Sequence, residues 1–352
     1  MDDSSQYRKR IEQALQRVFP AQVDTSWVTQ MAAHSCPEAR TDWANVFLEP
    51  GRELLNRGGK RWRPLVSVCV CEALGGGSSA DLFSILAEIP HNGSLIVDDI
   101  EDASTTRRGG PAVHLVHGED LSINMGNLMY FLPTFLFDDE SLDDSLVAAL
   151  SRDYMAALRR LHMGQGYDIL WHREKSVIPD EASYLRMCRY KTGSLSGFAA
   201  RIGVRGALGA GTEATACAER LGRAWESIGV GFQILDDVQN LSSGIPGKDK
   251  GDDIVEGKKS LPVILHCQSC PEDVPILVDL FERAALEAPQ GDWTAVYQAI
   301  EVIQSSGAIE KAKEKAHALL KEGREAVVEQ LPPGHPRDVL LGLLDQFIQT
   351  MV

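Results

Sequence analysis

The chain has 352 residues, of which 44% are hydrophobic and 24% charged, and its formal net charge at pH 7 is −15. This balance is typical of a soluble globular protein with a large core, and the acidity argues against a nucleic-acid partner because no basic tract offsets it. The seven cysteines show no even, regular spacing, so we expect no disulfide framework and a reducing, cytoplasmic compartment.

The N-terminal part of the chain carries no visible chemistry. Its first five residues include two aspartates and lack the apolar stretch of a signal peptide. Apolar positions recur with a helical period over residues 6–19, and residues 20–41 are mixed. We therefore expect residues 1–42 to form an N-terminal helical extension. The longest apolar segment, 128–137, contains Pro133 and is too short to cross a bilayer, so no transmembrane segment is expected.

A glycine pair and a basic cluster precede the third predicted helix. A helix expected over 43–56 is stopped by Gly58-Gly59, and Pro64 is suited to begin the next helix, over 64–74. Lys60, Arg61 and Arg63 therefore lie just ahead of a helix N-terminus, where free N–H groups favour an anion. The cluster is consistent with a phosphate site, although basic helix starts are also common on solvated surfaces.

The most distinctive stretch ends the next predicted helix, 81–102, which Pro90 should kink. Asp98 and Asp102 are at positions i and i+4, so their carboxylates share one helical face. Adjacent carboxylates repel unless a cation lies between them, and an oxygen-only ligand set suits Mg²⁺. His91 precedes Asp98 by seven residues and lies on the same face. The alternative is a solvated acidic helix end.

A second acidic stretch, Asp236-Asp237, follows an apolar helical run far along the chain and favours the metal interpretation. Between the two, Lys191-Thr192-Gly193 interrupts a helical pattern near its middle. After the second stretch, Lys250 and Lys258 lie in a polar, glycine-rich segment, which is consistent with either a flexible lid or a solvated surface.

The remaining apolar periodicities also predict helices, and no run with the alternation of a strand is found. We therefore predict an all-α protein with a single domain over residues 43–352. The further helices are expected over residues 120–137, 144–166, 180–208, 213–241, 259–268, 274–287, 292–306, 309–330 and 336–351.

Taken together, these motifs resemble those of the trans-isoprenyl diphosphate synthase family, the polyprenyl synthetases. The resemblance implies the helical isoprenoid synthase bundle around a central cavity, and a Mg²⁺-dependent head-to-tail condensation of isopentenyl diphosphate with an allylic diphosphate. It also implies a homodimer. The matching segments are Gly58–Pro64 (GGKRWRP), His91–Asp102 with Arg107–Gly109 (RRG), Lys191–Gly193 (KTG), Phe232–Asp237 (FQILDD) and Gly251–Lys258 (GDDIVEGK).

Roles carried over from the family are implied residue by residue. Asp98 and Asp102 would hold two Mg²⁺ ions, with Asp99 in support, and Asp236 would hold a third, with Asp237 binding its water. Isopentenyl diphosphate would be held by Lys60, Arg63, His91 and Arg108, and the allylic substrate by Arg107, Lys191, Thr192, Gln233 and Lys258. Lys250 is a further predicted substrate-binding residue.

The resemblance is strongest to geranylgeranyl diphosphate synthases. These enzymes share Asn240 in place of the usual last aspartate of the second motif, and the segment 164–171. Gly93 and Ser94, five and four residues before Asp98, are small where farnesyl-type enzymes carry aromatic side chains. The resemblance therefore implies an open product tunnel and a C20 product, with C25 or longer, or farnesyl diphosphate, as alternatives.

Three other functions compete with a synthase. A terpene cyclase shares the fold and the first motif, but residues 236–244 do not match its second metal motif, and it needs no isopentenyl site. A non-catalytic partner subunit would typically have lost its acidic motifs, whereas Asp98, Asp102 and Asp236 are present. A helical scaffold protein would leave the paired acidic and basic motifs unexplained.

Overall fold

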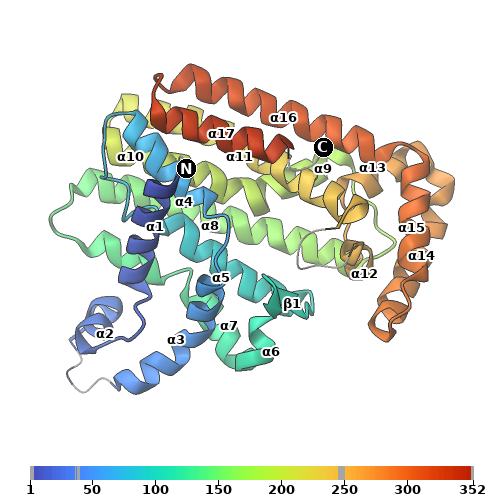
Figure 1. Ribbon diagram of the computed structural model, residues 1–352, viewed down its shortest axis with the longest axis horizontal. Coiled ribbons are helices and arrows are strands. Elements are labelled where there is room, and N and C mark those ends of the chain that lie inside the picture. Colours follow the sequence, from blue (N-terminus) through green and yellow to red (C-terminus); the bar gives the residue numbers. More distant parts are fainter. Residues whose placement is uncertain (1–3, 36, 38–39, 245–249, 350–352) are drawn as a thin grey trace. The chain divides into compact units, whose positions relative to one another are not determined.

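The computed structural model describes residues 4–35, 37, 40–244 and 250–349, and over these residues the chain is almost entirely helical (Figure 1). The predicted all-α class is confirmed. The chain divides into two compact units, each assembled from separated segments. Unit 1 comprises residues 1–156, 195–222 and 327–343, and unit 2 comprises residues 157–194, 223–326 and 344–352.

The elements of unit 1 come mainly from the first half of the chain. They are α1 (Ser5–Val18), α2 (Thr25–Ala32), α3 (Thr41–Asn56), α4 (Trp62–Ala73), α5 (Ile85–Glu101), β1 (Thr106–Arg107), β2 (Gly110–Pro111), α6 (Val113–His117), α7 (Glu119–Leu128) and the 3₁₀ helix η1 (Leu132–Asp138).

Unit 2 holds the elements around the second acidic stretch and most of the last third of the chain. They are α9 (Glu181–Cys188), the π-helical η2 (Arg189–Gly193), α12 (Asp252–Glu256), α13 (Leu261–Ser269), η3 (Pro271–Asp273), α14 (Val274–Glu287), η4 (Ala288–Gln290) and α15 (Thr294–Ser305). Five helices have residues in both units: α8 (Asp144–Arg173), α10 (Ser194–Leu208), α11 (Thr212–Ser242), α16 (Ala308–Gln330) and α17 (His335–Gln349).

Helix α1 is bound to the rest of unit 1 by both apolar and polar contacts. Tyr7 is fully buried and its hydroxyl donates to Glu72 of α4 at 3.0 Å. Arg10 donates to the same glutamate at 2.7 Å and forks onto Asp81 at 2.6 and 2.8 Å. A forked arginine–carboxylate pair fixes orientation as well as distance. The predicted boundary at residue 42 stays a prediction, but α1 packs as part of unit 1.

The close packing of α5 against α7 depends on glycine. A Cβ atom added at Gly93 of α5 would lie 2.7 Å from both the carbonyl oxygen of Gly126 and the Cβ of Met129. A Cβ at Gly126 would in turn lie 2.7 Å from the Cγ2 of Val97. Two helices approach this closely only where side chains are absent. The small size of Gly93 therefore has a packing reason in addition to the predicted one.

Unit 2 places a helical hairpin beside the short helix α12. Helices α14 and α15 lie side by side in this hairpin, joined by η4 (Figure 1). Gly251, which precedes α12, has φ +87°, and a Cβ there would lie 2.4 Å from the Cγ1 of Val296. Both observations favour glycine at this position.

Three sequence predictions about the elements were wrong in detail. Strands were not predicted, but β1 and β2 form a short antiparallel pair with Arg107 opposite Gly110. The helix expected over 81–102 begins at Ile85. The helix expected over 120–137 ends at Leu128, and the separate 3₁₀ helix η1 begins at Leu132. Such short or irregular elements have no hydrophobic period of their own. Among the described residues, no helix combines the length and apolarity that crossing a membrane requires.

Replacing Gly93 by alanine should destabilise the protein by about 1–3 kcal/mol, because the new methyl group would overlap a backbone oxygen that cannot move away freely. Gly166 of α8 has no heavy atom within 4 Å of an added Cβ. Gly166→Ala is therefore the matched control, and it should be neutral or slightly stabilising. Urea denaturation measures both, and equal midpoints for the two variants would contradict the packing argument.

Candidate active site

The first acidic cluster forms the C-terminal end of α5. The N–H of Asp102 donates to the carbonyl of Asp98 at 2.9 Å, which keeps the two residues one helical turn apart. Both side chains are partly exposed, whereas Asp99 is 1% exposed. The predicted shared face of Asp98 and Asp102 is therefore present, and it opens to solvent while Asp99 turns inward.

Arg107 connects the β1–β2 hairpin to this acidic cluster. Its Nε donates to the Oδ1 of Asp99 at 2.8 Å, and its Nη2 also bonds that oxygen. The same Nη2 lies 3.7 Å from the Oδ2 of Asp98. Asp99 thus holds a guanidinium group against the face that Asp98 presents.

A buried basic cluster lies in the same unit. Arg63 is buried and Arg108 is partly buried. The pKa of each is lowered to about 10, and burial is the largest cause. The repulsion between the two guanidinium groups lowers the pKa of Arg63 further, while Glu88 opposes both shifts. A bound anion would relieve this repulsion. Burial and the arginines also lower the pKa of His91 well below its ordinary value, which favours neutral imidazole.

The two arginines differ in how they are held. Arg108 donates through Nη1 to the carbonyl of Leu54 and to the Oδ1 of Asn92, both at 3.0 Å, and also to the carbonyl of Gly58. Arg63 lies over the ring of Trp62 at 4.4 Å, and its buried Nε has no hydrogen-bond partner among the described residues. Buried donors are normally paired, so Arg63 has a donor available for a ligand.

Arg61, between the two predicted phosphate ligands Lys60 and Arg63, has a structural role instead. It adopts φ +50°, and its guanidinium group donates to Glu12 at 3.0 Å, to Glu88 at 2.9 Å and to the carbonyl of Leu55 at 2.7 Å. Lys60 itself is exposed.

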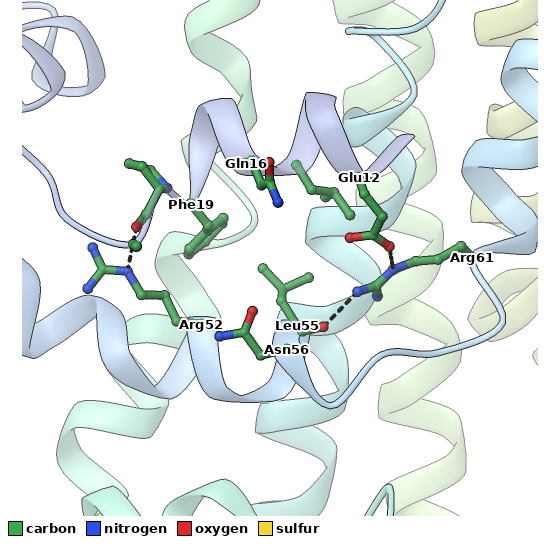
Figure 2. A pocket seen from close by; sticks show the side chains of 10 residues that line it. Glu12, Gln16, Phe19, Arg52, Leu55, Asn56 and Arg61 are labelled. Atoms are coloured by element: carbon green, nitrogen blue, oxygen red, sulfur yellow. Dashed lines mark hydrogen bonds and ion pairs between the residues drawn. The ribbon is translucent and has the colours of Figure 1, made fainter. Parts of the chain in front are cut away.

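A cavity of about 470 Å³ lies beside Arg61 in unit 1 (Figure 2). Of the basic cluster predicted from the sequence, Arg61 lines it, but the residues to which the family resemblance gives roles do not. Its polar walls are the side chains that hold α1, α3 and the loop before α4 in place. The lining residues are Glu12, Leu15, Gln16, Phe19, Pro20, Ala21, Arg52, Leu55, Asn56 and Arg61.

In unit 2, Lys191 lies on the π-helical segment η2. The predicted interruption at Lys191–Gly193 is therefore not a break, because α9, η2 and α10 follow one another without a gap. A Cβ at Gly164 of α8 would lie 2.3 Å from the backbone N of Lys191, so glycine permits this close approach. Single π-helical turns are frequent at functional sites.

Asp168 of α8 orients Lys191. The lysine Nζ donates to its Oδ2 at 2.6 Å, and the Nε2 of His172 lies 2.8 Å from its Oδ1. Burial opposes ionisation of Asp168, but Lys191, His172 and Lys258 outweigh it and hold the pKa of the carboxyl well below its usual range. Asp168 is thus a buried, ionised group that positions a cation.

A chain of hydrogen bonds links the second motif to η2. Thr192 donates to the Oε1 of Gln233 at 2.9 Å, Gln233 donates to the Oδ1 of Asp237 at 3.0 Å, and the hydroxyl of Tyr184 donates to its Oδ2 at 2.6 Å. Asp237 is 6% exposed, and burial, with added repulsion from Asp253, raises its pKa to about 7. A nearby cation would restore its charge.

Asn240, the departure from the family pattern, is fully buried. Its Oδ1 accepts from the N–H of Asp253 at 3.4 Å, and its backbone carbonyl accepts from the N–H of Gly251 at 3.1 Å. The residue therefore supports the start of α12. Lys258 follows that helix, with its Nζ 3.4 Å from the Oδ1 of Asp253 and bonded to Glu256.

The structure thus gathers the predicted residues into separate sets. Unit 1 holds one acidic set with Arg107 and one basic set around Arg63 and Arg108. Unit 2 holds Asp236, which is partly buried, and the set around Lys191, and Lys250 is partly exposed there. Sequence reasoning missed Asp168, Glu88 and Tyr184 as supporting residues. Only Asp168 had a local signal, since it follows the Gly164–Gly166 segment by two residues.

The polyprenyl synthetase family model matches residues 44–300, so the chain belongs to that family. The geranylgeranyl pyrophosphate synthase ltmG of Epichloe festucae is 35% identical over 242 residues, covering 68% of this chain and 66% of the relative. The geranylgeranyl pyrophosphate synthase janG of Penicillium janthinellum is 34% identical over 259 residues, which cover 72% of this chain and 66% of the relative. The chain therefore matches slightly less than two thirds of the length of these relatives.

The same fold is found in solved structures. The geranylgeranyl pyrophosphate synthetase of Pyrococcus horikoshii superposes with a TM-score of 0.77 at 26% identity, covering 98% of this chain and 99% of that one. A polyprenyl synthase of Caulobacter crescentus, complexed with calcium and isoprenyl diphosphate, gives a TM-score of 0.75 at 22% identity. The match covers 100% of this chain and 98% of that one. The second likeness establishes the fold alone.

The raised pKa of Asp237 predicts a pH dependence of stability in magnesium-free buffer. Below the ordinary aspartate pKa of about 3.9 the group is protonated in both states. As the pH rises from that value to about 7, the unfolded state is ionised while the folded state keeps its proton, so the folded state loses stability, and the loss is complete above about 7. Asp237→Asn should remove this loss, on the order of 4 kcal/mol.

Urea denaturation at pH values between 4 and 8 measures this difference. The exposed acid Glu282 of the same unit provides the control variant, Glu282→Gln, whose profile should follow the unmodified protein. Parallel profiles for Asp237→Asn and the unmodified protein would contradict the assignment.

Proposed function

We propose that this chain is a Mg²⁺-dependent head-to-tail prenyltransferase that condenses isopentenyl diphosphate with an allylic diphosphate, and that its product is geranylgeranyl diphosphate. Membership of the polyprenyl synthetase family supports the reaction class, and the printed names of its relatives support the C20 product. The observation that carries the proposal is the pairing, along α5, of a buried basic cluster near His91 with the acidic cluster from Asp98 to Asp102.

The donor chemistry of the acidic sets fits magnesium. Asp98, Asp102 and Asp236 offer carboxylate oxygens, which Mg²⁺ prefers, and burial with the repulsion of Asp253 and Asp236 raises the pKa of neighbouring Asp237, a shift that a bound cation would oppose. These three aspartates would hold the metal, three ions by the family resemblance, and Asp99 and Asp237 would support them. Bound Mg²⁺ would neutralise the negative charge of the diphosphate leaving group.

The cationic side chains of unit 2 are those that the family resemblance assigns to the allylic diphosphate. Asp168 holds Lys191 in one orientation, which lets the lysine approach a phosphate without first losing side-chain freedom. Thr192 and Gln233 are fixed by their mutual hydrogen bond and lie beside Asp237. Cleavage of the allylic C–O bond moves negative charge onto the diphosphate, and preorganised cations and donors stabilise this charge.

The basic cluster of unit 1 would bind the second substrate without metal. Arg63 and Arg108 supply the charge, and neutral His91 can donate one hydrogen bond to a phosphate oxygen. Holding isopentenyl diphosphate in place lets its double bond attack the allylic carbon, and such positioning provides much of the rate. The proton lost afterwards is acidic enough that no protein base is assigned.

The quaternary state and compartment follow from the same proposal. Exposed apolar side chains on α6 and α7, with exposed fractions of 58% at Leu115, 50% at Val116 and 41% at Ile123, support a homodimer through this surface. The acidic composition and the free cysteines of the described residues, most of them buried, support a cytoplasmic enzyme.

Incubation of the purified protein with isopentenyl diphosphate and dimethylallyl, geranyl or farnesyl diphosphate tests the reaction. With Mg²⁺, chromatography should show chain elongation up to C20, and chelation of the metal should abolish it. A protein that cyclises the allylic substrate, or leaves all three unchanged, would contradict the proposal.

Asp98→Asn should lower kcat/KM by at least roughly 10²–10³-fold, because it removes one metal-binding charge at the leaving group. The exposed Glu101 lies on the same helix outside the predicted set, so Glu101→Gln serves as the matched control. Circular dichroism should show that both variants keep the fold. Unchanged turnover of the folded Asp98→Asn variant would rule out this metal assignment.

Ser94 is the better position at which to test product length, since Gly93 is needed for packing against α7. Ser94 is partly exposed, and its hydroxyl donates only to the carbonyl of His91 at 2.8 Å. Ser94→Phe should therefore shift the product towards C15, whereas Ser94→Ala should leave the distribution unchanged. Product sizing measures both, and an unaltered C20 product from Ser94→Phe would refute the open-tunnel interpretation.

A further inference from the structure

A second cluster of metal-ligating residues lies in unit 2, at the C-terminal end of α13. His266, Cys270 and Asp273 each present one ligand atom, and these three atoms all lie within 4.8 Å of one another. None of these residues was singled out by the sequence analysis, which also overlooked the spacing Cys267-Gln268-Ser269-Cys270. Nothing in the proposed prenyl transfer uses them.

The local backbone brings the three residues together. His266 lies in the last turn of α13, and the N–H of Cys270 donates to its carbonyl at 2.8 Å, which places the cysteine one turn further on. Pro271 then begins η3, and the N–H of Asp273 donates to the carbonyl of Cys270 at 3.1 Å. The tight 3₁₀ turn returns the aspartate towards the histidine.

The hydrogen bonds of His266 determine its tautomer. Ser306 directly follows the last residue of α15. Its hydroxyl donates to the carbonyl of Ile303 at 3.2 Å, so its oxygen accepts from the Nδ1–H of His266 at 2.9 Å. In neutral imidazole the Nε2 is then an unprotonated acceptor. His266 is 0% exposed, and its Nε2 has no hydrogen-bond partner among the described residues.

This bare nitrogen lies 3.2 Å from the Oδ2 of Asp273, at ion-pair distance but without hydrogen-bond geometry. A lone pair and a carboxylate at this distance need a cation between them. The cation is either a proton on His266 or a metal ion. The nearby thiol of Cys270 favours the metal, because a proton shared by histidine and aspartate leaves sulfur without a role, whereas zinc binds all three ligand types.

We propose that His266 Nε2, Cys270 Sγ and a carboxylate oxygen of Asp273 form a Zn²⁺ site, with water as the fourth ligand. Zinc bonds of about 2.0–2.3 Å in a tetrahedron separate the ligand atoms by roughly 3.3–3.8 Å. The 3.2 Å between His266 and Asp273 is already close to this value, and small side-chain rotations bring in the sulfur.

The surroundings allow an ion to enter and to be held. The side chain of Asp273 is 28% exposed and Cys270 is partly exposed, while the histidine is anchored from behind by Ser306. Hydrogen bonds to the second nitrogen of a ligating histidine are a regular part of zinc sites. The site would join α13 to η3 and, through Ser306, to α15. Its mixed N, S and O ligands distinguish it from the oxygen-only magnesium sites.

Metal binding to the full-length protein tests the proposal directly. The protein is first stripped with a chelator and then incubated with Zn²⁺. It should retain about one equivalent of Zn²⁺ through desalting, and its Tm should be higher than that of the stripped protein. Co²⁺ in the same site should give a thiolate-to-cobalt charge-transfer band. Cys270→Ser should lose that band, and Cys270→Ser and Asp273→Asn should each lose the retained zinc, while both variants keep Mg²⁺-dependent prenyl transfer.

Two further variants make the test specific. Cys267 is buried and its pKa is raised to about 11, so it stays a thiol, and Cys267→Ala should retain zinc and the cobalt band. Ser306→Ala should weaken zinc affinity roughly 10–100-fold by removing the hydrogen bond that fixes the tautomer. If the unmodified protein retains no more zinc than Cys270→Ser, or its cobalt complex lacks the thiolate band, His266 and Asp273 form an ion pair only and the proposal is overturned.

Discussion

The structure depends on how buried like charges are compensated. In unit 1, Arg108 lowers the pKa of Arg63, Arg61 and Arg107 lower the pKa of Arg108, and Glu88 offsets only part of these shifts. In unit 2, Asp237 has the opposite imbalance, since burial, Asp253 and Asp236 all raise its pKa. Charges of one sign are costly to bury without partners. Each set is therefore suited to an external ion of opposite charge: a phosphate group for the arginines and a divalent cation for the acids.

Close backbone packing places these charges. Gly164 allows α8 to approach the backbone of Lys191, and Gly93 allows α5 to approach α7. At the first contact, the adjacent π-helical turn and Asp168 together orient the lysine. At the second, the tight crossing fixes the helix that carries His91 and the acidic cluster. Small residues at these positions contribute to function by setting distances between elements.

The helical class was accessible from the sequence because it follows from hydrophobic periods, and the candidate site residues were predicted from short motifs with fixed spacing. The paired acids at Asp98 and Asp102 needed only a helix to share a face. The role of Asp168, the structural use of Arg61 and the packing of Gly93 could not be predicted, since each depends on a partner distant in sequence. The β1–β2 hairpin and η2 were missed because they are too short to have a period.

The proposed function requires the two substrates to be bound by different kinds of charge, one by protein cations and the other through magnesium. Calorimetric titration with isopentenyl diphosphate, and separately with a non-hydrolysable allylic thiodiphosphate, measures this with and without Mg²⁺. We expect isopentenyl diphosphate to bind in the presence of chelator, whereas the allylic analogue should require the metal. Equal affinity of the allylic analogue with and without Mg²⁺ would contradict it.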